Sequence, residues 1–269
     1  IATLALTWFV IRCVRSDAPL LDLRLFRSRP FSAGIIAAFG TTFSMIAALL
    51  LVAQWLQLVD GATPIEAGIR MMPLAITGAI ASMLAPAVSR SIGARAVLAG
   101  GLGLAAIGML YLGVAGSDLN LAGVIIATSL IGAGTGSLAI ASAMIMAGSP
   151  VEKAGNAGAL EETSYEFGAT LGVAILGSIS ALIYRFQLAV DPALRGIDNG
   201  LLAGAKESLG AAVALGEQAG APELIERASA AFVSSLQAAG FAGGLFMLAV
   251  AVLVFVLVPK GTDVEGVEH

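Results

Sequence analysis

Six long stretches without a charged side chain constrain the fold of this chain more than any other feature. They cover residues 30–59, 71–89, 96–117, 119–151, 167–184 and 228–259. A helix needs about 20 apolar residues to cross ~30 Å of hydrocarbon, and each stretch meets or approaches that length. Irregular backbone and open sheet edges cannot face lipid, so the stretches are expected to be helices. The sequence therefore predicts an all-α integral membrane protein.

The composition supports a lipid bilayer as the surrounding medium and excludes several other classes of protein. Hydrophobic residues make up 58% of the chain and charged residues 12%, whereas a soluble domain carries about 25% charged residues. One cysteine and one histidine cannot form a Cys/His metal site or an intramolecular disulfide. The net charge of −4 and the lack of a continuous basic face argue against a nucleic-acid partner. We expect no metal and no cofactor.

Six complete membrane spans and one truncated span are expected. The opening apolar run, Ile1 to Ile11, is too short to cross a bilayer before Arg12 and Arg15, and is predicted to be the end of a longer span. The expected order is a truncated helix (1–13), a cytoplasmic link (14–30), five helices (31–184), an extracytoplasmic loop (185–231), a last helix (232–258) and a cytoplasmic tail (259–269). The long loop is expected to be aqueous and partly helical.

Basic residues predict which ends of the spans face the cytoplasm, because cytoplasmic loops of membrane proteins are enriched in Arg and Lys. Those next to the spans fall on one side: Arg12, Arg15, Arg24, Arg27, Arg29, Arg90, Arg95, Lys153 and Lys260. The tail is therefore predicted to be cytoplasmic. On the opposite side, Arg70 lies within a turn of the end of its span, where we expect its side chain to extend to the membrane surface.

Three glutamates enter the membrane from the predicted cytoplasmic side in the segment Gly155 to Gly177. Glu162 and Glu166 are four residues apart and share one helix face, whereas Glu161 lies about 100° away from Glu162 around the axis. At ~1.5 Å rise per residue, Glu166 lies roughly 6 Å deeper than Glu162. Depth therefore predicts that Glu166 loses the most contact with water.

Carboxylates within a membrane are typical of proton relays and of cation pathways. Exchange of a proton for an organic cation at Glu166, Glu162 or Glu161 is the simplest chemistry for drug/proton antiport. Tyr165 and Phe167 could add aromatic faces that attract cations. Alternatively, Glu161 and Glu162 only solvate the start of the helix, where acidic side chains also suit its dipole.

Glycines and arginines elsewhere predict close packing and an inner connection. Gly168 and Gly172 are spaced as in small-xxx-small helix contacts, and so are Gly132 and Gly136, with Gly134 between them. We expect these glycines to let helices approach closely. Arg90, Gly93 and Arg95 are expected in the inner connection between two spans, where the arginines either lock the loop to helix ends or hold the topology.

Three segments resemble the 14-span drug:proton antiporters of the major facilitator superfamily, particularly the quaternary ammonium compound efflux branch. Pro19 to Phe31 (PLLDLRLFRSRPF) looks like the cytoplasmic link before span nine, and Leu84 to Val97 (LAPAVSRSIGARAV) like the second-half copy of the cytoplasmic loop motif. AGNAGALEETSYEFGATLGVAILGS, starting at Ala154, looks like span thirteen. The similarity covers essentially the whole chain, which implies the C-terminal part of a major facilitator fold, with spans nine to fourteen.

The resemblance implies proton-driven efflux of drugs or organic cations, and thus multidrug resistance, in a bacterial cytoplasmic membrane. The acidic positions of span thirteen would fall on Glu161, Glu162 and Glu166. The proton gradient would replace any cofactor, and the missing N-terminal half would be a partner. An enzyme is not expected, because no histidine accompanies Ser164 and Thr163 at that depth. The alternatives are a non-transporting structural bundle and a transporter of another small solute.

Overall fold

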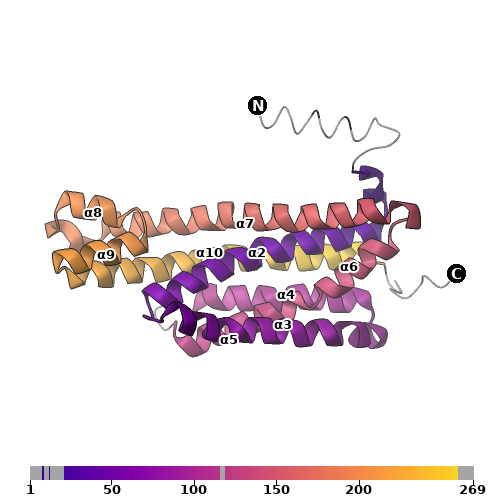
Figure 1. The fold of residues 1–269 in the computed structure, drawn as a ribbon, viewed down its shortest axis with the longest axis horizontal. Coiled ribbons are helices and arrows are strands. Elements are labelled where there is room, and N and C mark those ends of the chain that lie inside the picture. The colour runs from indigo at the N-terminus through magenta and orange to yellow at the C-terminus, as the bar shows by residue number, and fades with distance from the viewer. Residues whose placement is uncertain (1–7, 9–11, 13–20, 116–118, 260–269) are drawn as a thin grey trace.

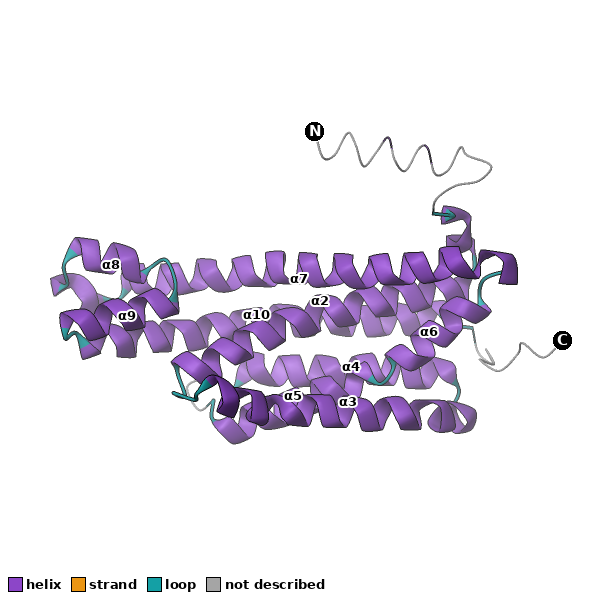
Figure 2. Cartoon of the chain, in the orientation of Figure 1, coloured by secondary structure: helices purple, strands orange, loops and turns teal. Residues whose placement is uncertain are grey.

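The computed structural model describes residues 8, 12, 21–115 and 119–259. Over these residues it contains helices and their connections and no strand (Figure 2). The predicted truncated span, 1–13, and the tail, 259–269, lie almost entirely outside the described residues. The helices are η1 (Leu23–Arg27), α2 (Arg29–Leu58), α3 (Pro64–Ile92), α4 (Ala94–Val114), α5 (Leu121–Thr135), α6 (Leu138–Ala147), η3 (Val151–Lys153), α7 (Ala154–Val190), η4 (Pro192–Gly196), α8 (Asn199–Ala205), α9 (Leu209–Ala219) and α10 (Pro222–Leu257).

Six helical segments of the described chain are long and apolar enough to cross a membrane, as the sequence predicts. They are α2, α3, α4, α5 together with α6, α7 together with η3, and α10. The expected all-α membrane fold with six complete spans is confirmed. Chain direction alternates between the two ends of the bundle. We call the end that carries α8 and α9 the outer end and the opposite end, with η1, the inner end (Figure 1).

The spans form a bundle in which α2 and α10 are central and α3 and α7 lie at opposite sides (Figure 1). The main helix contacts are those of α10 with α4, α7 and α2, of α5 with α3 and α4, and of α2 with α7 and α6. In the most apolar part of α2, 67% of the residues are buried, against 11% in α3. α3 is therefore the most peripheral of the six spans.

The fourth predicted span, residues 119–147, is interrupted in the middle. α5 ends at Thr135 and α6 begins at Leu138, so the break falls at the end of the glycine run that starts at Gly132. The hydroxyl of Thr135 donates to the Gly132 carbonyl at 2.7 Å, and the hydroxyl of Ser137 donates to the Gly134 carbonyl at 2.8 Å. Glycine has a low helix propensity, and such local hydroxyl bonds compete with the helix hydrogen bonds. Together they account for the break.

The segment predicted as an extracytoplasmic loop, 185–231, is largely helical and has an apolar interior. α7 continues to Val190, α10 starts at Pro222, and α8 and α9 lie between them at the outer end (Figure 1). Leu188, Leu209 and Leu224 belong to the same buried cluster as the outer part of α2. The outer segment therefore packs on the bundle as a cap of short helices.

The inner end of α7 is fastened to the link that precedes α2. Lys153 Nζ lies 2.5 Å from Asp22 Oδ2, and the Asp22 backbone N–H donates to Asn156 Oδ1 at 3.1 Å. Asp22 is 5% exposed. The hydrogen bond from Lys153 outweighs burial and lowers the pKa of the Asp22 carboxyl below its ordinary value. This contact fixes the point at which α7 enters the bundle.

Candidate functional site

Two glycines set the rotation of α7 against α2. A β-carbon at Gly168 would collide with the carbonyl oxygen of Phe39, and one at Gly172 would collide with that of Phe43. Only glycine allows the two backbones to come so close, as in other membrane helix pairs. The ring of Phe43 packs against that of Phe246 of α10, with 4.3 Å between the ring centres. These contacts decide which side chains of α7 point into the bundle.

Glu161 is the glutamate that points inward. Glu161 is only 8% exposed, and it lies on the same side of α7 as Gly168 and Gly172. The hydroxyl of Tyr165, one turn further along the helix, donates to Glu161 Oε1 at 2.9 Å. A buried carboxylate needs such a partner, because an unpaired one is costly in an apolar interior. Tyr165 therefore holds Glu161 in place.

Glu162 and Glu166 lie on the exposed surface of α7, away from α2. With Thr170, also exposed, they are spaced by four residues and form a polar stripe along the helix. Phe167, 51% exposed, lies beside this stripe. Within the described bundle Glu161 is buried and Glu166 is exposed, so the expectation that depth in the membrane shields Glu166 most stays a prediction for the complete protein. Burial follows the direction in which a residue faces, and Glu161 faces α2.

The glycines of the fourth span lie where it meets its neighbours. A β-carbon at Gly132 would collide with the backbone of α3, and one at Gly136 with Ala81 of that helix. One at Gly134 would lie 2.6 Å from the Ala105 side chain of α4. The three residues thus touch two helices, because residues two apart on a helix point about 200° away from each other and residues four apart share a face.

The predicted inner connection between α3 and α4 consists of a single residue. Gly93 alone separates the two helices, and its φ of +86° favours glycine. Arg90 lies in the last turn of α3, and Arg95 in the first turn of α4. The guanidinium carbon of Arg95 lies 3.8 Å from the centre of the Phe255 ring of α10. The side chain of Arg95 thus joins α4 to α10, and the expectation that it locks the inner connection or holds the topology stays a prediction.

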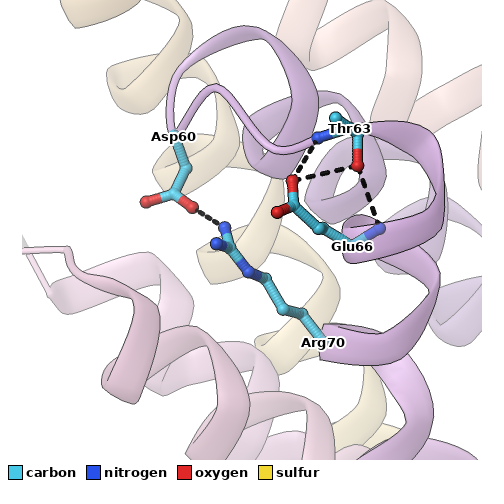
Figure 3. A network of polar contacts seen from close by, with 4 residues as sticks. All are labelled: Asp60, Thr63, Glu66 and Arg70. Carbon is cyan, nitrogen blue, oxygen red and sulfur yellow. Dashed lines mark hydrogen bonds and ion pairs between the residues drawn. The ribbon is translucent and has the colours of Figure 1, made fainter.

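The outer connection between α2 and α3 is held by four polar side chains (Figure 3). Thr63 and Glu66 form a reciprocal capping box at the start of α3. The guanidinium of Arg70 pairs with Asp60 across the turn. Asp60 thus supplies a partner for Arg70 at the outer end of its span, and the expectation that the Arg70 side chain extends to the membrane surface stays a prediction. This cluster braces the outer ends of two spans.

A second set of polar residues lies at the outer end of α7 and is not apparent from sequence reasoning. Gln54, Arg185 and Glu207 line one pocket with Tyr184 and Phe232. Their positions differ by about 150 residues, so no local pattern brings them together. The only signal is that Arg185 ends the charge-free stretch 167–184. Within the part of the chain that the structure describes, no group of three His, Cys, Asp or Glu side chains is arranged to hold a metal ion.

Comparison with known proteins identifies relatives of one kind, although no family model matches the chain. The multidrug efflux pump LfrA of Mycolicibacterium smegmatis is 32% identical over 250 residues, which cover 91% of this chain and 49% of that protein. The methyl viologen resistance protein SmvA of Salmonella typhimurium is 32% identical over 258 residues, 93% of this chain and 50% of that protein. The multidrug resistance protein Stp of Mycobacterium tuberculosis is 33% identical over 168 residues, 62% of this chain and 31% of that protein. The chain spans about half the length of the first two relatives.

Proposed function

This chain belongs to the multidrug efflux proteins of the major facilitator superfamily, and we propose that it forms the C-terminal half of a proton-coupled exporter. Its substrates would be drugs or organic cations, and its location the cytoplasmic membrane of a bacterium. The relatives are bacterial proteins named for efflux and resistance, which supports this assignment. The predicted missing N-terminal half would complete the transport pathway.

The observation that carries the proposal is the exposure of Glu162 and Glu166 on a membrane helix. A charged side chain within the hydrocarbon costs about 3 kcal/mol or more, so such groups face a bundle interior or an aqueous cavity. The polar stripe of α7 would therefore face the rest of the transporter, at a site shared between the two halves. In alternating access, the halves rock around such a site.

Each residue of the predicted site has a proposed role. Glu166, with Glu162 one turn away, would exchange a proton for the cationic group of a substrate. The exposed ring of Phe167 would contact the apolar or cationic part of the substrate. Glu161 is bound by Tyr165 and would position the helix and modulate the charge next to the site. Arg90, Gly93 and Arg95 would fix the inner ends of α3 and α4 during rocking.

The test is efflux of a fluorescent organic cation from vesicles that contain the complete transporter and carry an imposed proton gradient. We expect Glu166→Gln to abolish gradient-driven efflux, because the amide can neither take up the proton nor carry the charge. Glu152→Gln is the matched control, since Glu152 is exposed and precedes α7. It is expected to leave efflux unchanged.

Expression level and membrane insertion are compared for all variants before efflux is measured. Undiminished efflux by Glu166→Gln across a range of pH would remove this carboxylate from the mechanism. If the wild type itself exports no cation while a proton gradient is present, the proposed substrate class is wrong.

A further inference from the structure

One buried acidic residue attaches the link before α2 to the start of α7. Asp22 is 5% exposed, and both of its carboxylate oxygens have partners: Oδ2 lies 2.5 Å from Lys153 Nζ, and Oδ1 accepts from the Arg24 N–H at 3.0 Å. The Asp22 backbone N–H donates to Asn156 Oδ1 at 3.1 Å. One residue thus joins η1 to η3 and to the first turn of α7, at the inner end of the bundle (Figure 1).

An apolar cluster beside Asp22 makes this attachment stiff. Leu25 of η1 is 5% exposed, and Leu21 and Leu23 pack against the same cluster. Its other members come from three further helices: Phe31 and Ile35 of α2, Ile145 of α6, and Ala157 and Leu160 of α7. Because a close-packed apolar interior has little free volume, the link cannot slide along α7 without opening this cluster.

The polar contact fixes position more than it adds stability. The Asp22 side chain is 7% exposed and that of Lys153 is 40% exposed, so the attraction between them is offset by the water that Asp22 loses. The hydrogen bond from Lys153 holds the pKa of the Asp22 carboxyl below its ordinary value, so the charge is present at neutral pH. Both carboxylate oxygens and the N–H of Asp22 are used, and only one placement of the link on α7 satisfies all three.

α7 is unbroken between this attachment and the glutamates. It runs from Ala154 to Val190, 37 residues without a proline, whereas the fourth span is interrupted between α5 and α6. At ~1.5 Å rise per residue, Glu166 lies roughly 15 Å along the axis from Asn156. A continuous helix without proline curves only gently over such a distance. A displacement of the link at Asp22 is therefore carried along α7 to Glu166.

We propose that Asp22 is a positioning residue for transport, which makes the link and α7 move as one body through Lys153 and Asn156. This role rests on the proposed function, in which Glu162 and Glu166 form the site on α7. Asp22 acts through the position of the helix, since its own bonds go to η1, η3 and the first turn of α7. A movement of the polypeptide that precedes the link would then displace the glutamates during the transport cycle.

The test is gradient-driven efflux of a fluorescent organic cation by variants of the complete transporter, measured over a range of cation concentrations. Asp22→Asn removes the charge and keeps an oxygen that can accept from the Arg24 N–H. We expect the maximal rate to fall about fivefold or more while the apparent KM changes less than about twofold, because the contacts of the substrate are untouched. Lys153→Gln should have the same effect. Glu152→Gln is the matched control, since Glu152 is exposed and adjacent in sequence, and it should transport as the wild type does.

Two further variants separate the ion pair from a general loss of structure. The double variant Asp22→Asn/Lys153→Gln should be no slower than either single variant, because two partners of one contact are not additive. Lys153→Arg keeps the positive charge and should retain most of the wild-type rate. Additive losses, or a rate of Lys153→Arg as low as that of Lys153→Gln, would overturn the pairing. An apparent KM that rises while the maximal rate is unchanged would overturn the positioning role.

Hydrogen–deuterium exchange of the purified proteins tests the attachment without transport. Backbone amides of residues 158–165 should exchange about tenfold faster in Asp22→Asn and Lys153→Gln than in the wild type and Glu152→Gln. Equal exchange in all four proteins would show that Asp22 does not hold α7, and the proposal would be wrong. If the wild type exports no cation, the proposed function fails together with the transport role of Asp22, while the exchange rates still decide whether Asp22 fixes the start of α7.

Discussion

Replacement of Gly172 by alanine tests the closest helix contact in the bundle. The added β-carbon would collide with the backbone carbonyl of Phe43, and a backbone cannot move aside without shifting α2. Overpacking of this kind costs about 1–3 kcal/mol, while alanine in place of glycine regains up to ~1 kcal/mol of helix propensity. The net loss of stability is therefore about 0–2 kcal/mol. At about 2–4 °C per kcal/mol, the Tm should fall by up to roughly 8 °C.

Thermal unfolding of the purified protein in one detergent, followed by a thiol-independent fluorescence signal, measures this shift. Gly158→Ala is the matched control on the same helix, because its β-carbon would meet only the terminal methyl of Met146 at 3.9 Å. Its Tm should equal or exceed that of the wild type. If the two alanine variants have the same Tm, the close approach of α7 and α2 at Gly172 is refuted.

Two further contacts give measurable expectations. The ion pair with Lys153 lowers the pKa of Asp22 below 3.8, so its stabilisation is complete above that pH and is lost as pH falls through the lowered value. The Tm difference between wild type and Asp22→Asn should thus be constant near neutrality and shrink below pH 3.8; a difference that grows on acidification would contradict this. Arg95→Ala and Phe255→Leu should each lower stability, with a coupling energy of about 0.5–2 kcal/mol in a double-mutant cycle of unfolding free energies. Additive effects would show that the stacked pair contributes nothing.

The number of spans could be predicted because each span is identified by the mean hydropathy of a long stretch of residues, which a single residue barely changes. Each of the six charge-free stretches contains enough apolar residues to require a membrane, whatever their order. The ends of the helices depend instead on local hydrogen bonds. α10 extends ten residues before the predicted start at Phe232, because the cap helices supply an apolar partner for Leu224. No charge pattern within residues 222–231 announces that partner.

The acidic residues of α7 could be found from sequence, but their relative burial could not. Spacing fixes the angle between Glu161 and Glu162, since both belong to one helix. Spacing does not fix which of the two glutamates faces α2, because the rotation of α7 about its axis is set by the contact of Gly168 and Gly172 with the α2 backbone. Likewise, Arg95 is recognisable as an inner basic residue, whereas its stacking on Phe255 requires the packing of α4 on α10.

The two most exposed spans differ in what they require from their surroundings, and this difference bears on where the proposed N-terminal half would pack. The part of α3 between Arg70 and Arg90 exposes uncharged side chains such as Ile76 and Met83, which lipid can cover at no electrostatic cost. α7 exposes Glu162 and Glu166, which lipid cannot cover cheaply. The proposed N-terminal half would therefore close over the polar stripe of α7. A surface that covered only α3 would leave two carboxylates facing hydrocarbon.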